Sequence, residues 1–146
     1  MKRIIAITTV AALFAGLVTA VAYAATQKDF GGPIKDGGTI SFGAIRSSGK
    51  YTKAGEFVIN KIPLKCSVGN TRGTFSTGSF VNVSSQRKFS YTFNFGGSQV
   101  VKVNGQFNSA GTKATGTVSA SHVNFSAEHT NCHTVGTKDW KAQTYL

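Results

Sequence analysis

The sequence predicts an all-β fold: a single antiparallel β-sandwich of about eight strands, preceded by a cleavable N-terminal signal helix. Three observations lead to this prediction. Between residues 87 and 95, aromatic and polar residues alternate, which is the period of a strand with one buried face. Gly, Ser and Asn recur about every dozen residues, as turns do in sandwiches and barrels. No window repeats apolar residues at the period of a helix.

Residues 1–24 have the layout of an export signal. Lys2 and Arg3 precede an uncharged run that ends on the small-x-small cleavage pattern Ala22-Tyr23-Ala24. We expect cleavage after Ala24 in a bacterial host, whereas an uncleaved membrane anchor is the alternative, since the run is just long enough to span a bilayer. The protein is therefore expected to be secreted or to lie in the cell envelope.

The rest of the chain is expected to form one domain. Residues 25–38 are rich in turn residues and predict an irregular segment, while residues 39–146 predict the β-sandwich. Each expected strand is rich in β-branched or aromatic residues and is bounded by turn residues. In order, these strands are 39–45, 56–66, 71–76, 79–84, 87–95, 99–107, 113–125 and 135–145.

Turn lengths predict the register of the three central strands. A three-residue turn, Gly96-Gly97-Ser98, keeps the apolar residues on one face, whereas a two-residue turn would not. The next turn places two glycines opposite each other, and we expect the ring of Phe89 to cover them. The expected pairs are Phe93 with Val101, Tyr91 with Val103, Phe89 with Gly105, Gly105 with Gly116, Phe107 with Ala114, and Val103 with Val118.

Cys66 and Cys132 are the only cysteines. In an exported chain such a pair most simply forms a disulfide, which would stabilise the fold by roughly 4 kcal/mol in the chain-entropy model. The alternative is a metal site. His129, Cys132 and His133, with Cys66 or His122, could supply the nitrogen and sulfur ligands that zinc or copper prefers. Their spacing matches no standard zinc motif, so we expect no metal and no other cofactor.

Basic residues concentrate between residues 46 and 102, where Glu56 is the single acid. Removal of Lys2 and Arg3 with the signal lowers the formal charge from +11 to +9. Such a zone attracts polyanions, although isolated basic residues also fit an ordinary solvated face. Anionic envelope polymers or glycans are the expected partners, nucleic acid is not, and membrane contact is expected only through an uncleaved signal. The basic residues of this zone are Arg46, Lys50, Lys53, Lys61, Lys65, Arg72, Arg87, Lys88 and Lys102.

Carbohydrate binding is a related possibility. The outer faces of the predicted strands carry hydroxyl and amide groups that could bind sugars, and Tyr51, Trp140 or Tyr145 could supply a stacking ring. The alternative is that a polar outer face is ordinary for a sheet and that Trp140 anchors the core.

Catalysis is not expected. The acidic residues are scattered, and the chain has no nucleophile elbow, metalloprotease motif or phosphate loop. No catalytic residue is assigned, and a hydrolase with an unrecognised site is the third hypothesis. The first is a non-catalytic binding or structural protein, and the second is a polyanion or carbohydrate binder that uses residues 46–102.

Four segments carry a resemblance to known proteins: Ile62-Pro63-Leu64-Lys65-Cys66, Val103-Asn104-Gly105-Gln106-Phe107, Ala114-Thr115-Gly116-Thr117-Val118, and the ending from Cys132 through Gly136 to Trp140-Lys141-Ala142. Together they resemble a group of small secreted bacterial β-sandwich proteins, chiefly actinobacterial, that have no assigned function. In that group the ending usually reads Cys-x-Thr-Gly, followed shortly by Trp, whereas here His133-Thr134-Val135-Gly136 follows Cys132 and has one residue inserted. The resemblance implies a sandwich with a disulfide and no particular activity.

Overall fold

The computed structural model describes residues 24–145, which form strands and turns but no helix. The predicted signal helix lies outside the described residues. Within them, no helix has the length and apolar character needed to cross a membrane. The strands are β1 (Thr26–Pro33), β2 (Thr39–Ser47), β3 (Lys50–Lys65), β4 (Asn70–Ser76), β5 (Phe80–Asn82), β6 (Lys88–Asn94), β7 (Val100–Phe107), β8 (Lys113–Ser121) and β9 (Lys138–Thr144).

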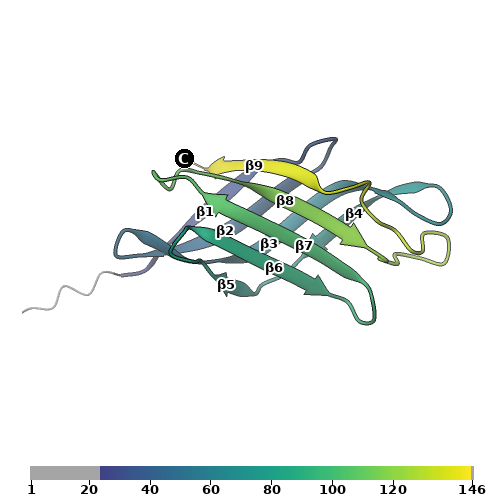
Figure 1. Ribbon diagram of the computed structural model, residues 1–146, viewed down its shortest axis with the longest axis horizontal. Helices are drawn as coiled ribbons and strands as arrows, with labels where there is room; N and C mark the ends of the chain where they lie inside the picture. The colour runs from purple at the N-terminus through teal and green to yellow at the C-terminus, as the bar shows by residue number, and fades with distance from the viewer. Residues whose placement is uncertain (1–23, 146) are drawn as a thin grey trace, which may run out of the picture.

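The strands form one antiparallel sheet in the order β4-β3-β2-β1-β9-β8-β7-β6, and β5 pairs with β3. The sheet curls into a half-barrel, so that β6, β7 and β8 lie across the strands β1 to β4 (Figure 1). The prediction of an antiparallel all-β fold is confirmed. Residues 24–145 do not form the two separate sheets of a sandwich, because β1 pairs with both β2 and β9 and joins the two halves.

β1 occupies most of the segment that was expected to be irregular, so that prediction is wrong. Its glycines suggest turns in the sequence, but in the structure they allow close approach between strands. A Cβ on Gly32 would overlap the carbonyl oxygen of Lys141 on β9. Only the end of the segment is a turn, closed by the amide of Ile34 donating to Gly38 O at 3.0 Å.

The predicted meander of β6, β7 and β8 is confirmed in every pair. Phe89 lies opposite Gly105, which lies opposite Gly116. Phe89 covers Gly105, while the ring of Trp140 covers Gly116. The predicted strand 87–95 is one residue too long at each end, because β6 spans Lys88–Asn94, and Phe95 beyond it is 48% exposed.

Aromatic side chains fill the space inside the curl. Phe42 lies at its centre, with ring centroids 5.1 Å from Phe30, 5.4 Å from Phe57, 5.4 Å from Phe89 and 5.8 Å from Trp140. These rings come from both halves of the sheet, so burying them holds the halves together.

Bulges in β3 allow the sheet to curl. This strand begins at Lys50, earlier than the predicted Glu56, and runs for 16 residues. Glu56 and Lys61 have positive φ values of 53° and 55°, and the register with β2 and β4 shifts near them. A bulge bends and twists a strand, which is how one long strand follows the curved core.

The half-barrel has two ends. We call one the mouth end: it carries the β2–β3 turn, the β5–β6 connection and the β7–β8 turn. We call the other the disulfide end: it carries the β1–β2, β3–β4 and β6–β7 turns and the long β8–β9 connection, residues 122–137. Residues far apart in the sequence therefore meet at each end.

Candidate functional site

The disulfide end is closed by the β8–β9 connection. Cys66 and Cys132 form the predicted disulfide. Beside it, the amide of Lys65 donates to His133 O, and that of His133 donates to Lys65 O, both at 2.9 Å. The end of β3 is thus tied to the far half of the sheet.

The histidines near this disulfide contact other groups. His122 Nδ1 lies 2.7 Å from Asn131 Oδ1, and His129 Nδ1 lies 3.4 Å from Ser126 Oγ. Cys66 and Cys132 are bonded to each other, so neither offers a thiolate to a metal. Across residues 24–145, no three His, Cys, Asp or Glu side chains are grouped as metal ligands.

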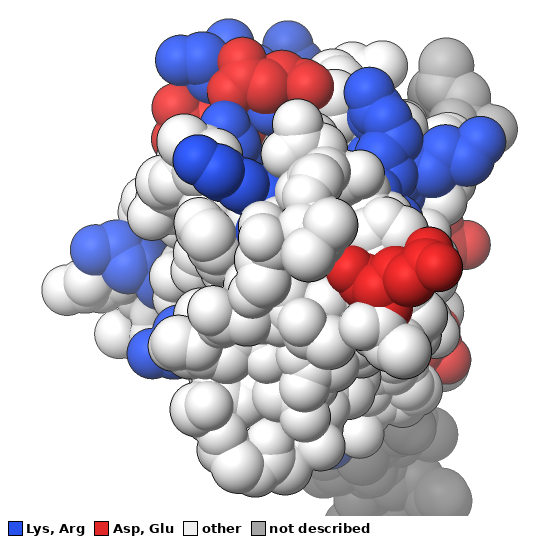
Figure 2. All heavy atoms as spheres, turned by 90° about the vertical axis from the view of Figure 1, so that its right-hand side faces the viewer, with Lys and Arg blue, Asp and Glu red and all other residues white. Residues whose placement is uncertain are grey.

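The predicted basic zone is divided in space rather than forming one patch. Figure 2 shows the disulfide end, where Lys and Arg side chains form separate groups and much of the lower surface is uncharged. Arg46, Lys50 and Arg87 line a hollow at the mouth end, whereas Lys65 and Arg72 line one at the disulfide end. Lys102 lies on the exposed outer face of β7.

The mouth hollow, as we call the first of these, has a volume of about 700 Å³. It collects residues from the β2–β3 turn, the β5–β6 connection and the β7–β8 turn, and none of its lining residues is acidic. Arg87 Nε donates to Phe107 O at 3.2 Å, which leaves its Nη donors for a ligand. Within the described residues, the single ion pair lies elsewhere, between Lys138 and Asp36. The lining residues are Arg46, Gly49, Lys50, Tyr51, Thr52, Asn82, Val83, Ser84, Ser85, Arg87, Asn108, Ser109, Ala110 and Gly111.

Tyr51 forms the floor of the mouth hollow. Its ring stacks on Phe107 with centroids 4.5 Å apart, and Arg46 lies over it with Cζ 5.8 Å from the centroid. Its hydroxyl donates to Gly111 O at 2.8 Å and so links β3 to the β7–β8 turn. Burial raises the pKa of Tyr51 above its ordinary value of 10.0, and the positive charge of Arg46 opposes this. The hydroxyl therefore remains a neutral donor at physiological pH.

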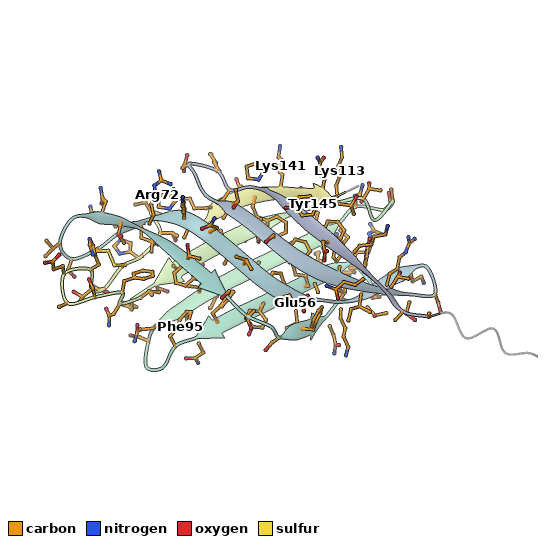
Figure 3. The ribbon with its side chains drawn as sticks, turned by 180° about the vertical axis from the view of Figure 1, so that it is seen from behind. Glu56, Arg72, Phe95, Lys113, Lys141 and Tyr145 are labelled. Atoms are coloured by element: carbon orange, nitrogen blue, oxygen red, sulfur yellow. A yellow bond between two sulfur atoms is a disulfide. The ribbon has the colours of Figure 1, made fainter. Side chains whose placement is uncertain are left out.

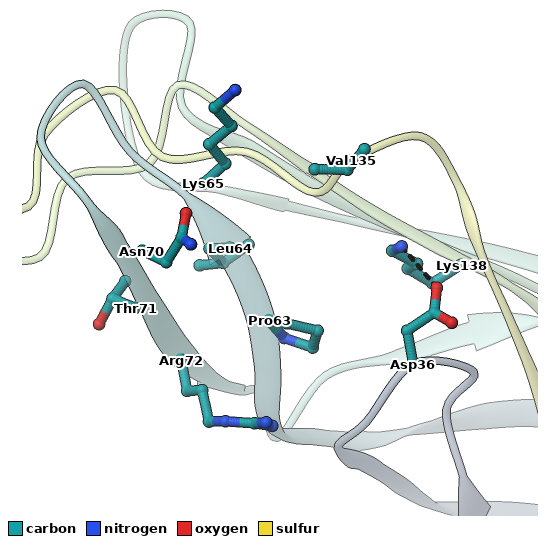
Figure 4. Close-up of a pocket in the computed structure, with 9 residues that line it drawn as sticks. All are labelled: Asp36, Pro63, Leu64, Lys65, Asn70, Thr71, Arg72, Val135 and Lys138. Carbon is teal, nitrogen blue, oxygen red and sulfur yellow. Dashed lines mark hydrogen bonds and ion pairs between the residues drawn. The ribbon is translucent and has the colours of Figure 1, made fainter.

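The hollow at the disulfide end has a volume of about 710 Å³ and mixed charge (Figure 4). Lys138 Nζ lies 2.7 Å from Asp36 Oδ2, and this contact lowers the pKa of Asp36 below its ordinary value of 3.8. Arg72 Nη1 donates to Lys61 O at 3.1 Å. Figure 4 shows Lys65 pointing away from Arg72, so these two cations do not converge. This arrangement suits an anion less well than the mouth hollow does.

A third hollow, which we call the outer trough, crosses the outer faces of β6, β7 and β8 and has a volume of about 720 Å³. Its walls carry hydroxyl and amide groups, and Lys88 is its only charged residue. The lining residues are Asn82, Ser84, Lys88, Phe89, Ser90, Asn104, Gly105, Gln106, Thr115, Gly116 and Thr117.

The three proposed stacking residues have different surroundings. Trp140 is 1% exposed and belongs to the core, so its prediction as a sugar platform is wrong. Tyr51 is covered by Phe107 on its ring face and is half-buried. Tyr145 is 64% exposed and lies over Gly31 on the outside of β1, near Lys113 and Lys141 (Figure 3).

Two acidic residues are brought together by the fold. Gln27 Nε2 donates to Glu56 Oε2 at 2.8 Å and to Asp29 Oδ1 at 3.3 Å, so one amide bridges both carboxylates on the outer surface. Glu128 lies separately in the β8–β9 connection. Residue types alone did not predict this pairing.

Sequence reasoning missed the polar residues of the mouth hollow. Asn82 is the last residue of β5, Asn108 follows β7, and neither belongs to a motif. The alternating direction of the strands could have predicted the position of some of them. In a meander, every second turn lies at the same end of the sheet, so the start of β6 and the β7–β8 turn must lie together. The β2–β3 turn reaches the mouth hollow because the sheet curls, and no local sequence pattern predicts that curl.

Comparison of the chain with protein-family models, curated proteins and solved structures gives no match.

Proposed function

We propose that this protein is an exported, non-catalytic binding protein that holds an anionic polymer at the mouth hollow. The observation that carries the proposal is the gathering of Arg46, Lys50 and Arg87 on one hollow that has no acidic lining residue. Cations without acidic neighbours create a positive potential that attracts and orients a polyanion.

The disulfide supports the location. Disulfides persist in oxidising compartments, and Cys66–Cys132 agrees with the export signal expected in residues 1–24. A polyanion of the cell envelope would meet the protein in that compartment.

The test is binding of inorganic polyphosphate, a probe that is recognised by charge alone. We expect binding at low salt and a steep loss of affinity at moderate salt, because bound counterions are released on association. Lys50→Gln should lower the affinity and reduce the slope of log K against log salt by about one.

Lys102→Gln is the matched control, since it removes the same charge from an exposed strand position that lines none of the three hollows. Equal effects of the two substitutions would mean that net charge attracts the probe and the mouth hollow does not. Absence of binding at low salt would reject the proposal.

A further inference from the structure

The mouth hollow and the outer trough adjoin each other. Asn82 and Ser84 line both, at the connection between β5 and β6. A chain-like ligand held at the mouth can therefore continue over these two residues onto the outer faces of β6, β7 and β8.

The two hollows differ in chemistry. Arg46, Lys50 and Arg87 line the mouth hollow, whereas Lys88 is the only charged residue of the trough. A ligand that carries charged groups alone, such as polyphosphate, would match the first and leave the polar groups of the second unsatisfied. A ligand that fits both must combine anionic groups with neutral hydrogen-bonding groups.

The polar groups of the trough are free to bind. Within the described residues, the side chains of Asn104, Thr115 and Thr117 make no hydrogen bond to other protein groups. Gln106 Nε2 donates to Gln86 O at 3.2 Å, which holds the amide in place and leaves its Oε1 as an acceptor. Hydroxyls and amides that both donate and accept complement the hydroxyl groups of sugars.

The trough also lacks a surface for stacking bases. Phe89, the single aromatic residue in its lining, is 4% exposed. Single-stranded nucleic acids usually gain affinity by stacking bases on aromatic rings. Sugar hydroxyls can instead be bound by the hydroxyl and amide groups that line the trough.

From these observations we infer that the ligand is an acidic polysaccharide. Its carboxylate or other anionic groups bind in the mouth hollow, and its sugar hydroxyls bind in the outer trough. This inference rests on the proposed function, because it names the class of polyanion that the mouth hollow holds.

The experiment compares a hexameric oligogalacturonate with polyphosphate on the full mature chain, by isothermal titration calorimetry at low salt. The trough variant is Thr115→Val with Thr117→Val, which removes two hydroxyls that line the trough and keeps β-branched side chains in β8. It should lower oligogalacturonate affinity about tenfold, as expected for two lost hydrogen bonds, and leave polyphosphate affinity within about twofold. Thr92→Val is the control, a like change on the outer face of β6 outside both hollows.

Lys50→Gln separates this inference from the proposed function. It should weaken binding of both probes. If Lys50→Gln weakens oligogalacturonate binding but the trough variant does not, the polyanion site stands and the polysaccharide inference is overturned. If neither probe binds, both fail. Asn104→Ala replaces the trough variant if the double substitution does not fold, and it should weaken oligogalacturonate binding alone.

Discussion

Gly105 and Gly116 lie opposite each other because two aromatic rings occupy the space above them. A Cβ on Gly105 would overlap Phe89, and one on Gly116 would overlap Trp140 and the carbonyl oxygen of Asn104. The obstacles at Gly105 are side-chain atoms of Phe89 and Trp140, whereas those at Gly116 include backbone that is held in the sheet. Gly116 should therefore tolerate an added side chain less well than Gly105.

Gly116→Ala should destabilise the protein more than Gly105→Ala does. We expect about 1 to 3 kcal/mol for Gly105→Ala and more for Gly116→Ala, because overpacking against backbone cannot relax by rotation of a side chain. Denaturant unfolding measures both. Gly78→Ala is the control, since a Cβ there meets nothing within 4 Å and should change stability by less than about 0.5 kcal/mol. Equal effects at Gly105 and Gly78 would contradict this account.

The Asp36–Lys138 pair gives a pH-dependent prediction. Its hydrogen bond and charge interaction lower the pKa of Asp36 below 3.8 in the folded state. The stability that this pair contributes is present above the unfolded pKa and is lost as the pH falls through the lowered folded pKa. Lys138→Gln should raise the pKa of Asp36 towards its ordinary value, as followed by NMR titration of its carboxyl carbon. An unchanged titration midpoint would rule out the pairing in solution.

At the scale of elements, β6 is an edge strand while its neighbour β7 is central. The amide of Phe95 donates to Gln99 O and that of Phe107 to Arg87 O. Alternation along the ladder then directs the N–H of Thr92 away from β7, and the N–H of Lys102 towards β8. Thr92 and Lys102 lie opposite each other on the exposed outer face, so they differ mainly in this hydrogen bond.

Proline substitution should distinguish these two positions. Thr92→Pro removes an N–H that has no partner in the ladder and should be tolerated within about 1 kcal/mol, as proline is on edge strands. Lys102→Pro removes a ladder bond to β8 and should cost about 3 kcal/mol or more. Thermal unfolding of the two variants, with Thr92→Ala and Lys102→Ala as controls for the side chains, makes the comparison. A smaller loss for Lys102→Pro than for Thr92→Pro would mean that the assigned ladder is reversed.

The meander could be predicted from the sequence because its register depends on local information. The three-residue turn after Phe95 and the alternation along β6 fix which residues face inward. β1 could not be predicted in this way, because two adjacent glycines occur both in turns and in strands. Only the structure shows that Gly31 and Gly32 lie in a strand, where other parts of the chain pack closely against them. This single error also concealed the continuity of the sheet, since β1 is the strand that joins its halves.

At the scale of the whole molecule, the sequence also did not predict which basic residues gather at the candidate site. The charge distribution along the chain identified Arg46, Lys50 and Arg87 but grouped them with Lys65 and Arg72, which the curl carries to the opposite end. Sequence proximity does not determine which ends of the strands meet. That depends on the bulges in β3 and on packing across the core, both of which are non-local.

The disulfide spans this curl, because it connects the end of β3 to the β8–β9 connection, in opposite halves of the sheet. Cys66 and Cys132 are separated by 66 residues in sequence, so removing the bond should lower the free energy of unfolding by roughly 4 kcal/mol in the chain-entropy model. The double variant Cys66→Ala with Cys132→Ala, unfolded in denaturant, measures the loss. In this model the effect acts on the unfolded chain, so the variant should keep the near-ultraviolet circular dichroism of buried Trp140 while its unfolding midpoint falls. If the near-ultraviolet signal of Trp140 is lost at denaturant concentrations below the unfolding midpoint, the chain-entropy account is contradicted. The disulfide would then stabilise the folded state, by holding the curled sheet closed.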